Sequence, residues 1–481
     1  MRVGILTQFP SQSVQSGPAL QSSFLYRGLK DRGHQARFIG PDTRSIAPCD
    51  DDAARLFPAY SYPTHPNVKL SMPDSLRRVF AESPEVDVLH SQAASQIIHY
   101  GLWAREMWGI PMINTHIIHL PTHIHFLMSD KLWATPIVKR FWQDQAYQGE
   151  LRYGALYNRG DCLVVQSRHF VQYWRERGVT VPIEVVGRPL NPNTFSRQPT
   201  RDPFPEHFVH GKRLVVACRH DREKNLEKLV DIFSRHIAPA APQVTMTLVG
   251  DGHDHKNLYD YARRQAHADR IFFPGEVDHG DLVNWYAHAD LFVYTSVSET
   301  FGNVVNEALW SGLPVVALDD KMGVSGQVVD DVNGRLIDPD RPDAQAAFAA
   351  ACISLLGDRS RRRAMGEQAA NLSRLNSHPE VVLKRFERIY SEAQEHRRRC
   401  LPVPLNRRGR LAQMRSFTRE IGLWISGHAL VLGIAHTATR LGAARTGGAV
   451  QHTADMQAEQ QVGHRAPQVN DRPDLIEASR R

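Results

Sequence analysis

The chain has 481 residues, of which 42% are hydrophobic and 23% are charged. This length suffices for two domains and a tail, and the composition is ordinary for a soluble globular protein. The formal net charge of +7 is modest and comes largely from the C-terminal region, so we expect no nucleic-acid partner for the body of the chain.

The cysteines and the N-terminus indicate the compartment. The five cysteines include no C-x-x-C pair, and two of them, Cys162 and Cys218, fall in apolar runs that read as strands, which favours buried free thiols. The apolar run at residues 3–6 is too short for a signal peptide, and no stretch has the length of a confident membrane span. We therefore predict a cytoplasmic body.

Short apolar runs alternate with helical patterns in the first part of the chain. Residues 19–31 are predicted to form a helix that ends at Gly33. The predicted strands are residues 3–6, 35–39, 86–90, 111–116, 161–167 and 183–186. This alternation is typical of a parallel sheet with helices on both faces.

A proline-rich connector at residues 187–205 divides the chain, and we place the domain boundary at residue 190. A second alternating series follows, with predicted strands at residues 214–217, 245–249, 271–273, 291–294 and 314–317. The sequence thus predicts two doubly wound, Rossmann-like domains, residues 1–190 and 191–377. Because ligands bind beyond the carboxyl ends of such strands, a site is expected between the domains.

The end of the chain has a different character. Residues 378–398 are predicted to form an amphipathic helix, and residues 399–481 a basic, partly apolar tail that is largely disordered at its end. Eight arginines between positions 397 and 419 precede a short apolar stretch, residues 421–435. This region either attaches to an anionic membrane surface or is a basic tail whose apolar part packs on the body.

Two glutamates, Glu299 and Glu307, lie eight positions apart between two predicted strands. Glu299 would lie in a loop, and Glu307 in the following helix, about one and a half turns from its start. The backbone N–H groups of Gly302, Asn303 and Val304 would be the unpaired donors of that helix, which makes a phosphate site. Carboxylates of this kind hold ribose and hexose hydroxyls.

Two cations begin the second domain. Arg219 is predicted to end a strand and Lys224 to begin a helix, so both can point toward the space between the domains. Such a pair would stabilise the charge that gathers on a departing diphosphate. The alternative is a surface charge cluster, since Asp221 and Glu223 lie beside them.

The segment from Glu299 to Glu307, with Phe301 and Gly302 in its loop, closely resembles the E-x7-E signature of the retaining glycosyltransferases of GT-B fold. That family contains bacterial mannosyl- and glucosyltransferases and sucrose synthases. The Arg-x4-Lys-Asn spacing from Arg219 is similar to its phosphate-binding pair. The resemblance covers about residues 1–396 and implies a GT-B fold and same-face transfer of a hexose from a nucleotide diphosphate sugar.

Residue roles follow from this resemblance. Arg219 and Lys224 would bind the diphosphate, Glu299 the sugar hydroxyls and Glu307 the ribose. The remaining donor-binding residues would be Gly17, Gly250, Phe301, Gly302, Asn303 and Val304. Two of these are qualified, because Gly17 stands where the family often has two glycines and Gly250 also fits a plain turn. The run at residues 322–329 lacks the family's Gly-Gly and acidic residue, so donor specificity does not carry over.

Four histidines, His116, His119, His123 and His125, cluster at and just after a predicted strand. Imidazoles are common zinc ligands, but no cysteine or carboxylate lies among them, and the family usually needs no metal ion. The resemblance implies a histidine here that hydrogen-bonds the donor sugar near its reacting carbon. We assign this role to His116, with His119 as the alternative, and expect no metal or other cofactor.

The sequence therefore predicts a hexosyltransferase. The donor would be a nucleotide sugar such as UDP-glucose or GDP-mannose, and the acceptor a hydroxyl such as that of a lipid or lipid-linked glycan. A GT-B-fold sugar-nucleotide epimerase is a rival that the E-x7-E loop and the Arg/Lys pair disfavour. A non-catalytic nucleotide-sugar-binding protein stays open, because binding and catalytic residues coincide.

Overall fold

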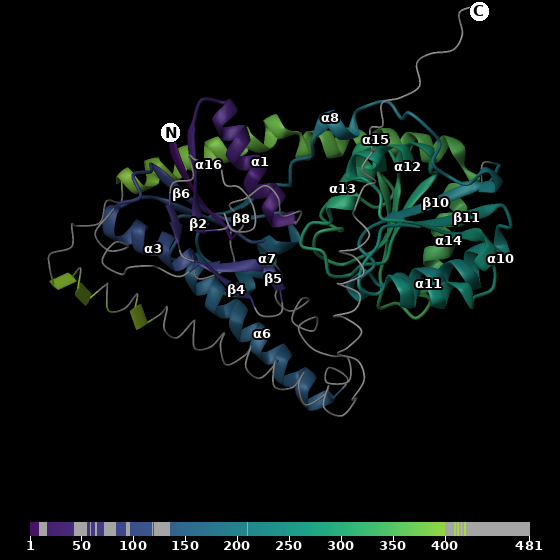
Figure 1. Cartoon of the computed structure of the whole chain (residues 1–481), viewed down its shortest axis with the longest axis horizontal. Coiled ribbons are helices and arrows are strands. Elements are labelled where there is room, and N and C mark those ends of the chain that lie inside the picture. Colours follow the sequence, from purple (N-terminus) through teal and green to yellow (C-terminus); the bar gives the residue numbers. More distant parts are fainter. Residues whose placement is uncertain are drawn as a thin grey trace, which may run out of the picture.

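The protein consists of two α/β domains side by side, the first purple to blue and the second teal to green in Figure 1. This computed structural model describes residues 1–8, 17–42, 55–57, 59–62, 65–71, 83–92, 97–117, 119, 135–208, 210–399, 408–409, 411–412, 415 and 418–419. The predicted fold class, two doubly wound domains, is confirmed within these residues.

The first domain is built on a seven-stranded sheet whose described pairings are all parallel. In spatial order its strands are β3 (Arg55–Phe57), β2 (Gln35–Pro41), β1 (Arg2–Leu6), β6 (Val88–Ser91), β7 (Met112–Thr115), β8 (Cys162–Val165) and β9 (Ile183–Val185). A separate antiparallel hairpin joins β4 (Ala59–Tyr62) to β5 (His65–Ser71).

The second domain has a six-stranded parallel sheet. Its strands, in spatial order, are β12 (Ile271–Gly275), β11 (Val244–Val249), β10 (Lys212–Ala217), β13 (Leu291–Tyr294), β14 (Val315–Leu318) and β15 (Gly334–Ile337). The predicted boundary at residue 190 lies between the last strand of the first sheet and the first strand of the second.

Helices connect the strands of each sheet. Those of the first domain are α1 (Gly17–Asp31), α3 (Ile97–Trp108), α6 (Pro136–Tyr157) and α7 (His169–Glu176). Those that follow are α8 (Pro192–Phe195), α9 (Leu226–Ile232), α10 (Ala238–Ala240), α11 (His255–Arg263), α12 (Leu282–His288), α13 (Asn303–Trp310), α14 (Ala344–Gly357), α15 (Arg359–Ser377) and α16 (Pro379–Arg399). Short 3-10 or π turns form η2 (Glu206–Phe208), η3 (Arg222–Lys224), η4 (Phe233–Ile237), η5 (Ala268–Arg270) and η6 (His279–Asp281).

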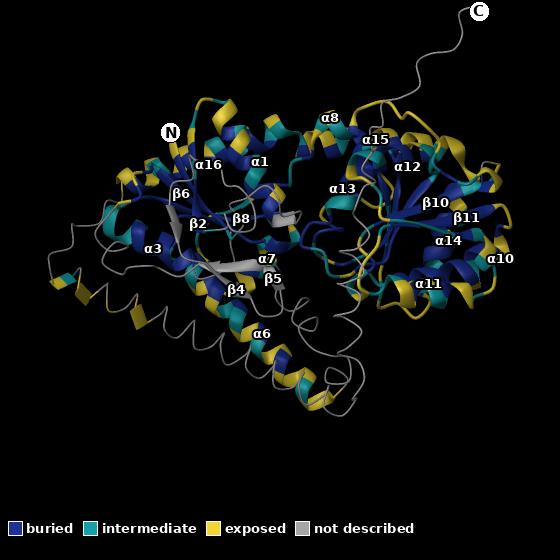
Figure 2. Ribbon diagram, viewed as in Figure 1, coloured by how far each residue is buried: buried dark blue, intermediate teal, exposed yellow. Residues whose placement is uncertain are grey.

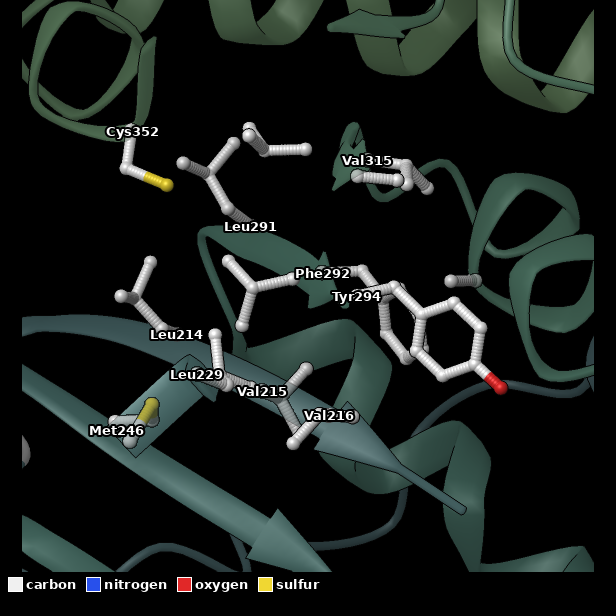
Figure 3. Close-up of a cluster of buried hydrophobic side chains, with 14 of the residues drawn as sticks. Leu214, Val215, Val216, Leu229, Met246, Leu291, Phe292, Tyr294, Val315 and Cys352 are labelled. Atoms are coloured by element: carbon white, nitrogen blue, oxygen red, sulfur yellow. The ribbon is translucent and has the colours of Figure 1, made fainter. Parts of the chain in front are cut away.

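The central strands of both sheets are buried on both faces, and those of the second sheet therefore read as continuous apolar runs. Figure 2 shows these strands in dark blue, with exposed residues on the outer helices. In the second domain the core joins β10, β13 and β14 to α9 and α14 (Figure 3). Tyr294, the last residue of β13, belongs to this core, and its hydroxyl group reaches the candidate site described below.

Helix α16 returns to the first domain and packs beside α1. Leu383 fills the space next to Gly28, so a Cβ atom at that glycine would clash with it. Arg32, which directly follows α1, donates to both Glu380 and Glu387 of α16. Arg397, in the last turn of α16, is buried and donates to the carbonyl oxygens of Gly109 and Arg105. It therefore does not belong to a lipid-facing basic surface, contrary to the sequence-based expectation.

The two domains also touch through the loop that follows β14. The Ser167 hydroxyl, beyond the end of β8, donates to the Met322 carbonyl oxygen at 2.6 Å, and the His169 ring lies 3.3 Å from the Ser325 carbonyl oxygen. A Cβ atom at Gly326 would lie 2.3 Å from the Ser167 hydroxyl oxygen. A residue larger than glycine at position 326 would therefore require Ser167 or the loop to shift.

The predicted membrane-binding segment at residues 421–435 lies outside the described residues. In the described part of the chain, no helix combines the length and apolar composition needed to cross a bilayer.

Candidate active site

Strand β13 and helix α13 position the two glutamates. The buried strand ends at Tyr294, and the loop after it reaches Gly302, which has φ of 84° and starts α13. Glycine adopts this left-handed conformation without steric cost, so the chain can turn at Gly302 and begin α13 at Asn303. The Gln327 side chain holds the loop by donating to the carbonyl oxygens of Phe301 and Gly302.

Glu299 forms a largely buried ion pair with Lys224, in which each side chain is 13% exposed. One of its carboxylate oxygens, Oε1, accepts from Lys224 Nζ at 2.6 Å, from the Tyr294 hydroxyl at 2.7 Å and from the Ser296 hydroxyl at 3.0 Å. Burial by itself raises the pKa of Glu299, but the Lys224 charge and these hydrogen bonds outweigh it and lower the pKa to about 2. The carboxylate is therefore ionised at every physiological pH.

Lys224 is fixed by a turn rather than by the helix that the sequence predicts. It is the last residue of η3, and α9 begins only at Leu226, after Asn225 in the left-handed conformation. The Thr295 hydroxyl donates to the carbonyl oxygens of Lys224 and Asn225, which ties this turn to the end of β13. Burial opposes its charge, but Glu299 and Glu223 outweigh it and raise the pKa of Lys224.

Arg219 lies two residues beyond the end of β10 and is more exposed than expected, with 70% of its side chain accessible. Its guanidinium pairs with Asp221 at 2.8 Å and with Glu223 at 3.3 Å. Glu223 also lies 3.1 Å from Lys224, so both predicted cations share one carboxylate. The surface charge cluster and the predicted cation pair are thus the same group of residues.

Glu307 is buried within α13, with 4% of its surface exposed. Its two carboxylate oxygens accept from different residues: Oε1 lies 2.9 Å from His279 Nε2, and Oε2 lies 3.3 Å from the Tyr286 hydroxyl. His279 belongs to η6, and neither periodicity nor a motif marks it in the sequence. It is a site residue that sequence reasoning missed, because only the fold brings it to Glu307.

The His279–Glu307 contact predicts a pH dependence of stability. Its hydrogen bond with Glu307 raises the pKa of His279 above the ordinary 6.5, although burial opposes this. A raised folded-state pKa adds stability that is complete below the unfolded-state value and is lost as pH rises through the folded-state value. The stability advantage of wild type over His279→Gln, measured by urea unfolding, should therefore be larger at about pH 6 than at about pH 9. An equal advantage at both pH values would contradict the pairing.

The start of α13 offers backbone donors. Among the described residues, no acceptor pairs with the N–H groups of Gly302, Asn303 or Val304, whereas the next N–H, of Val305, bonds to the Gly302 carbonyl oxygen at 3.1 Å. These donors lie in the loop and first turn between Glu299 and Glu307. An anion placed there would gain hydrogen bonds and the favourable end of the helix dipole.

The other two glycines predicted to bind the donor, Gly17 and Gly250, lie away from this loop in the sequence. Gly17 is the first residue of α1 rather than part of a loop, and the loop before it lies outside the described residues. Gly250 has φ of 128°, its N–H donates to the Gly275 carbonyl oxygen at 2.8 Å, and a Cβ atom would meet the Cys218 carbonyl oxygen at 2.0 Å. Only glycine therefore fits at position 250, between Cys218 just after β10 and Gly275 of β12.

His116 directly follows β7 and is buried, with 2% exposure. Its ring packs edge-on against Phe170 and Trp174 of α7, at centroid distances of 4.8 and 4.9 Å. His119, the alternative, is 3.0 Å from the Tyr173 hydroxyl. His123 and His125 lie outside the described residues, and nowhere in the described chain do three or more potential ligands gather to hold a metal ion.

Comparisons with known proteins agree with this architecture. Residues 201–372 match the family model described as glycosyl transferases group 1, and residues 16–189 match the glycosyl transferase 4-like domain. An alpha-monoglucosyldiacylglycerol synthase from Streptococcus pneumoniae is 22% identical over 66% of this chain and 71% of its own length. A GDP-mannose-dependent alpha-mannosyltransferase from Mycobacterium tuberculosis is 28% identical over 60% of this chain and 72% of its own length.

Solved structures share the fold. HepE from Anabaena, in complex with UDP, superposes with a TM-score of 0.59 at 18% identity, over 82% of this chain and all of that chain. Sucrose-phosphate synthase from Thermosynechococcus elongatus gives a TM-score of 0.59 at 19% identity, over 82% of this chain and 98% of that one. The two family matches, the relatives and the architecture together show that this chain belongs to the glycosyltransferases of GT-B fold.

Proposed function

We propose that this glycosyltransferase is a retaining hexosyltransferase that moves a hexose from a nucleotide diphosphate sugar to an acceptor hydroxyl. The observation that carries the proposal is the largely buried Lys224–Glu299 pair beside the start of α13, whose first N–H groups pair with no acceptor in the described part of the chain. A cation, a fixed carboxylate and backbone donors at one place suit a ligand that is both a phosphate and a polyol.

Different residues would bind different parts of the donor. Lys224 would neutralise the charge that develops on the leaving diphosphate, and the N–H groups of Asn303 and Val304 would take phosphate oxygens. Glu299 would keep one carboxylate oxygen, Oε2, for sugar hydroxyls, because Oε1 accepts the hydrogen bonds from Lys224, Tyr294 and Ser296. Glu307, held by His279, would accept from the ribose hydroxyls.

The relatives support the substrate classes. One is a GDP-mannose-dependent mannosyltransferase, which supports a nucleotide-hexose donor, and another is a glucosyldiacylglycerol synthase, which supports a lipid acceptor. We propose that His116 contacts the donor sugar near its reacting carbon. Its buried ring packs against α7, which would hold the imidazole in one orientation.

The test is incubation of the full-length protein with UDP-glucose or GDP-mannose and a lipid extract. Transfer of labelled hexose to lipid supports the proposal. Release of an epimerised nucleotide sugar would instead identify an epimerase, and binding of the donor without turnover would identify a non-catalytic binding protein. Each of these two results contradicts the proposal.

We expect activity without a divalent metal ion, because Lys224 and Arg219 supply the positive charge that a metal would otherwise bring to the diphosphate. Transfer measured in excess EDTA should equal transfer in added magnesium or manganese. Complete loss in EDTA that either metal restores would overturn this expectation.

We also propose that the tail attaches the enzyme to the cytoplasmic face of an anionic membrane, since each basic residue near such a surface contributes about 1 kcal/mol. The full chain should co-sediment with anionic liposomes at low salt and dissociate at high salt. Deletion of residues 400–481 should abolish co-sedimentation but spare donor hydrolysis. Failure of the full chain to co-sediment at low salt would sink this proposal.

A further inference from the structure

Arg188 lies in the connector between the domains, where the sequence shows only a proline-rich linker. The connector packs closely there: a Cβ atom at Gly187 would come within 3.3 Å of the Asn376 carbonyl oxygen and 3.7 Å of the Phe301 ring. The Asn306 side chain of α13 also donates to the Arg188 carbonyl oxygen at 3.5 Å. The backbone therefore delivers the Arg188 side chain to the loop that carries Glu299.

The Arg188 guanidinium bridges the two domains. Its Nε donates to Gln166 Oε1, beyond β8, at 3.0 Å, and its Nη1 donates to Asn303 Oδ1, at the start of α13, at 3.3 Å. Gln166 is itself oriented by a 2.7 Å hydrogen bond to Gln21 of α1. The guanidinium also lies 5.8 Å from the Phe301 ring centroid.

Within the described chain, the side-chain oxygens that accept from this guanidinium both belong to neutral amides. No Asp or Glu of the described chain forms an ion pair with Arg188, and the carboxylate that influences it, Glu299, is already bound by Lys224. Burial lowers the pKa of Arg188 to about 10, so it still carries its charge at neutral pH. The Arg188 side chain is only partly exposed, and a cation that is partly withdrawn from water is normally paired with an anion, which points to a partner supplied by the substrate.

We propose that Arg188 binds an oxyanion of the donor substrate beside the start of α13. This inference rests on the proposed function and adds to it a residue from the connector. The bond to Asn303 places the guanidinium next to the backbone donors of the helix start, and Arg presents five N–H groups in a planar fork, of which two are used here. Because Gln166 of the first domain orients the guanidinium, oxyanion binding depends on the arrangement of both domains.

Two groups of a nucleotide sugar could supply the oxyanion, the diphosphate or an acidic substituent on the sugar. The first arm of the test measures the affinities of UDP, UMP and uridine, and of GDP, GMP and guanosine, for full-length protein by calorimetry. If the diphosphate supplies the oxyanion, Arg188→Gln should weaken binding of the diphosphate of the preferred base about 10- to 100-fold and leave binding of the nucleoside unchanged. Arg188→Lys, which keeps the charge, should lose less of this affinity.

Arg374→Gln is the matched control, because Arg374 also lies over an aromatic ring, that of Trp310, at 5.9 Å, but on α15. The second arm compares UDP-glucose with UDP-glucuronate. Weakening of both donors by Arg188→Gln assigns the guanidinium to the diphosphate, and weakening of the glucuronate alone assigns it to an acidic sugar. Either result supports the inference.

The failures can be told apart. If wild type binds no nucleoside diphosphate, the proposed function and this inference both fall. If wild type binds but Arg188→Gln matches Arg374→Gln for every ligand, only the inference falls. A uniform loss for nucleoside, monophosphate and diphosphate also overturns it, because that result would mean that Arg188 only holds the two domains together.

Discussion

Lys224→Ala should lower kcat for sugar transfer about a hundredfold, because we expect the largely buried Lys224 ammonium to stabilise the charge developing on the leaving diphosphate. One such contact, made mainly in the transition state, contributes on the order of 3 kcal/mol. The donor KM should change less, since the ground-state diphosphate keeps the helix donors. Steady-state kinetics with the preferred donor measures both parameters.

The control must separate catalysis from folding. Lys224→Ala leaves the Glu299 carboxylate buried without its counter-charge, and loss of one partner of a buried pair costs about 3–5 kcal/mol of stability. The double variant Lys224→Ala/Glu299→Gln removes both charges and should recover much of the thermal stability without recovering activity. Lys256→Ala, at an exposed ion pair on α11, should behave as wild type. Turnover of purified Lys224→Ala within a few-fold of wild type would refute the assignment.

Glu307→Ala should also reduce transfer about a hundredfold, but through donor binding. The carboxylate would accept two ribose hydroxyl bonds, and hydrogen bonds to a charged group contribute about 1.5–3 kcal/mol each. These bonds exist before and during the reaction, so their loss should appear mainly in the donor KM. Glu307→Gln keeps the shape and should lose part of the affinity.

Matched measurements identify the ribose as the partner of Glu307. The 2′-deoxy form of the nucleoside diphosphate should bind wild type more weakly, and Glu307→Ala should bind both forms alike. Glu367→Ala, at an exposed glutamate on α15, is the control for loss of a carboxylate. An unchanged preference for the ribo form in Glu307→Ala would show that this carboxylate does not contact the ribose.

Much of the fold could be predicted because buried parallel strands are continuous apolar runs. The prediction for β13 coincides with the observed strand, and those for β10, β11 and β14 differ by one or two residues at an end. Strand β15 was not predicted, because Arg335 and Gly334 interrupt its apolar pattern. The hairpin of β4 and β5 and the long helix α6 were also missed, since polar residues dilute their periodicity.

The site also contains residues that the sequence predicts and residues that only the fold reveals. Glu299, Glu307 and the helix start are close in sequence, so one local motif predicted their placement. His279 and Arg188 reach that motif only through tertiary packing, from 28 and 115 residues away in their contacts with Glu307 and Asn303. Local patterns carry no signal for such approaches, and Lys224 shows a milder case, because its turn depends on hydrogen bonds from Thr295.

The anomeric configuration of the transferred sugar distinguishes retaining from inverting transfer. Product isolated early in the reaction with the preferred donor should show, by NMR, the same anomeric configuration as that donor, because leaving phosphate and acceptor would occupy one face of the sugar. The signal should be absent from Lys224→Ala product mixtures after the same time. A product of inverted configuration would show that the enzyme is not a retaining transferase, contrary to the proposed function.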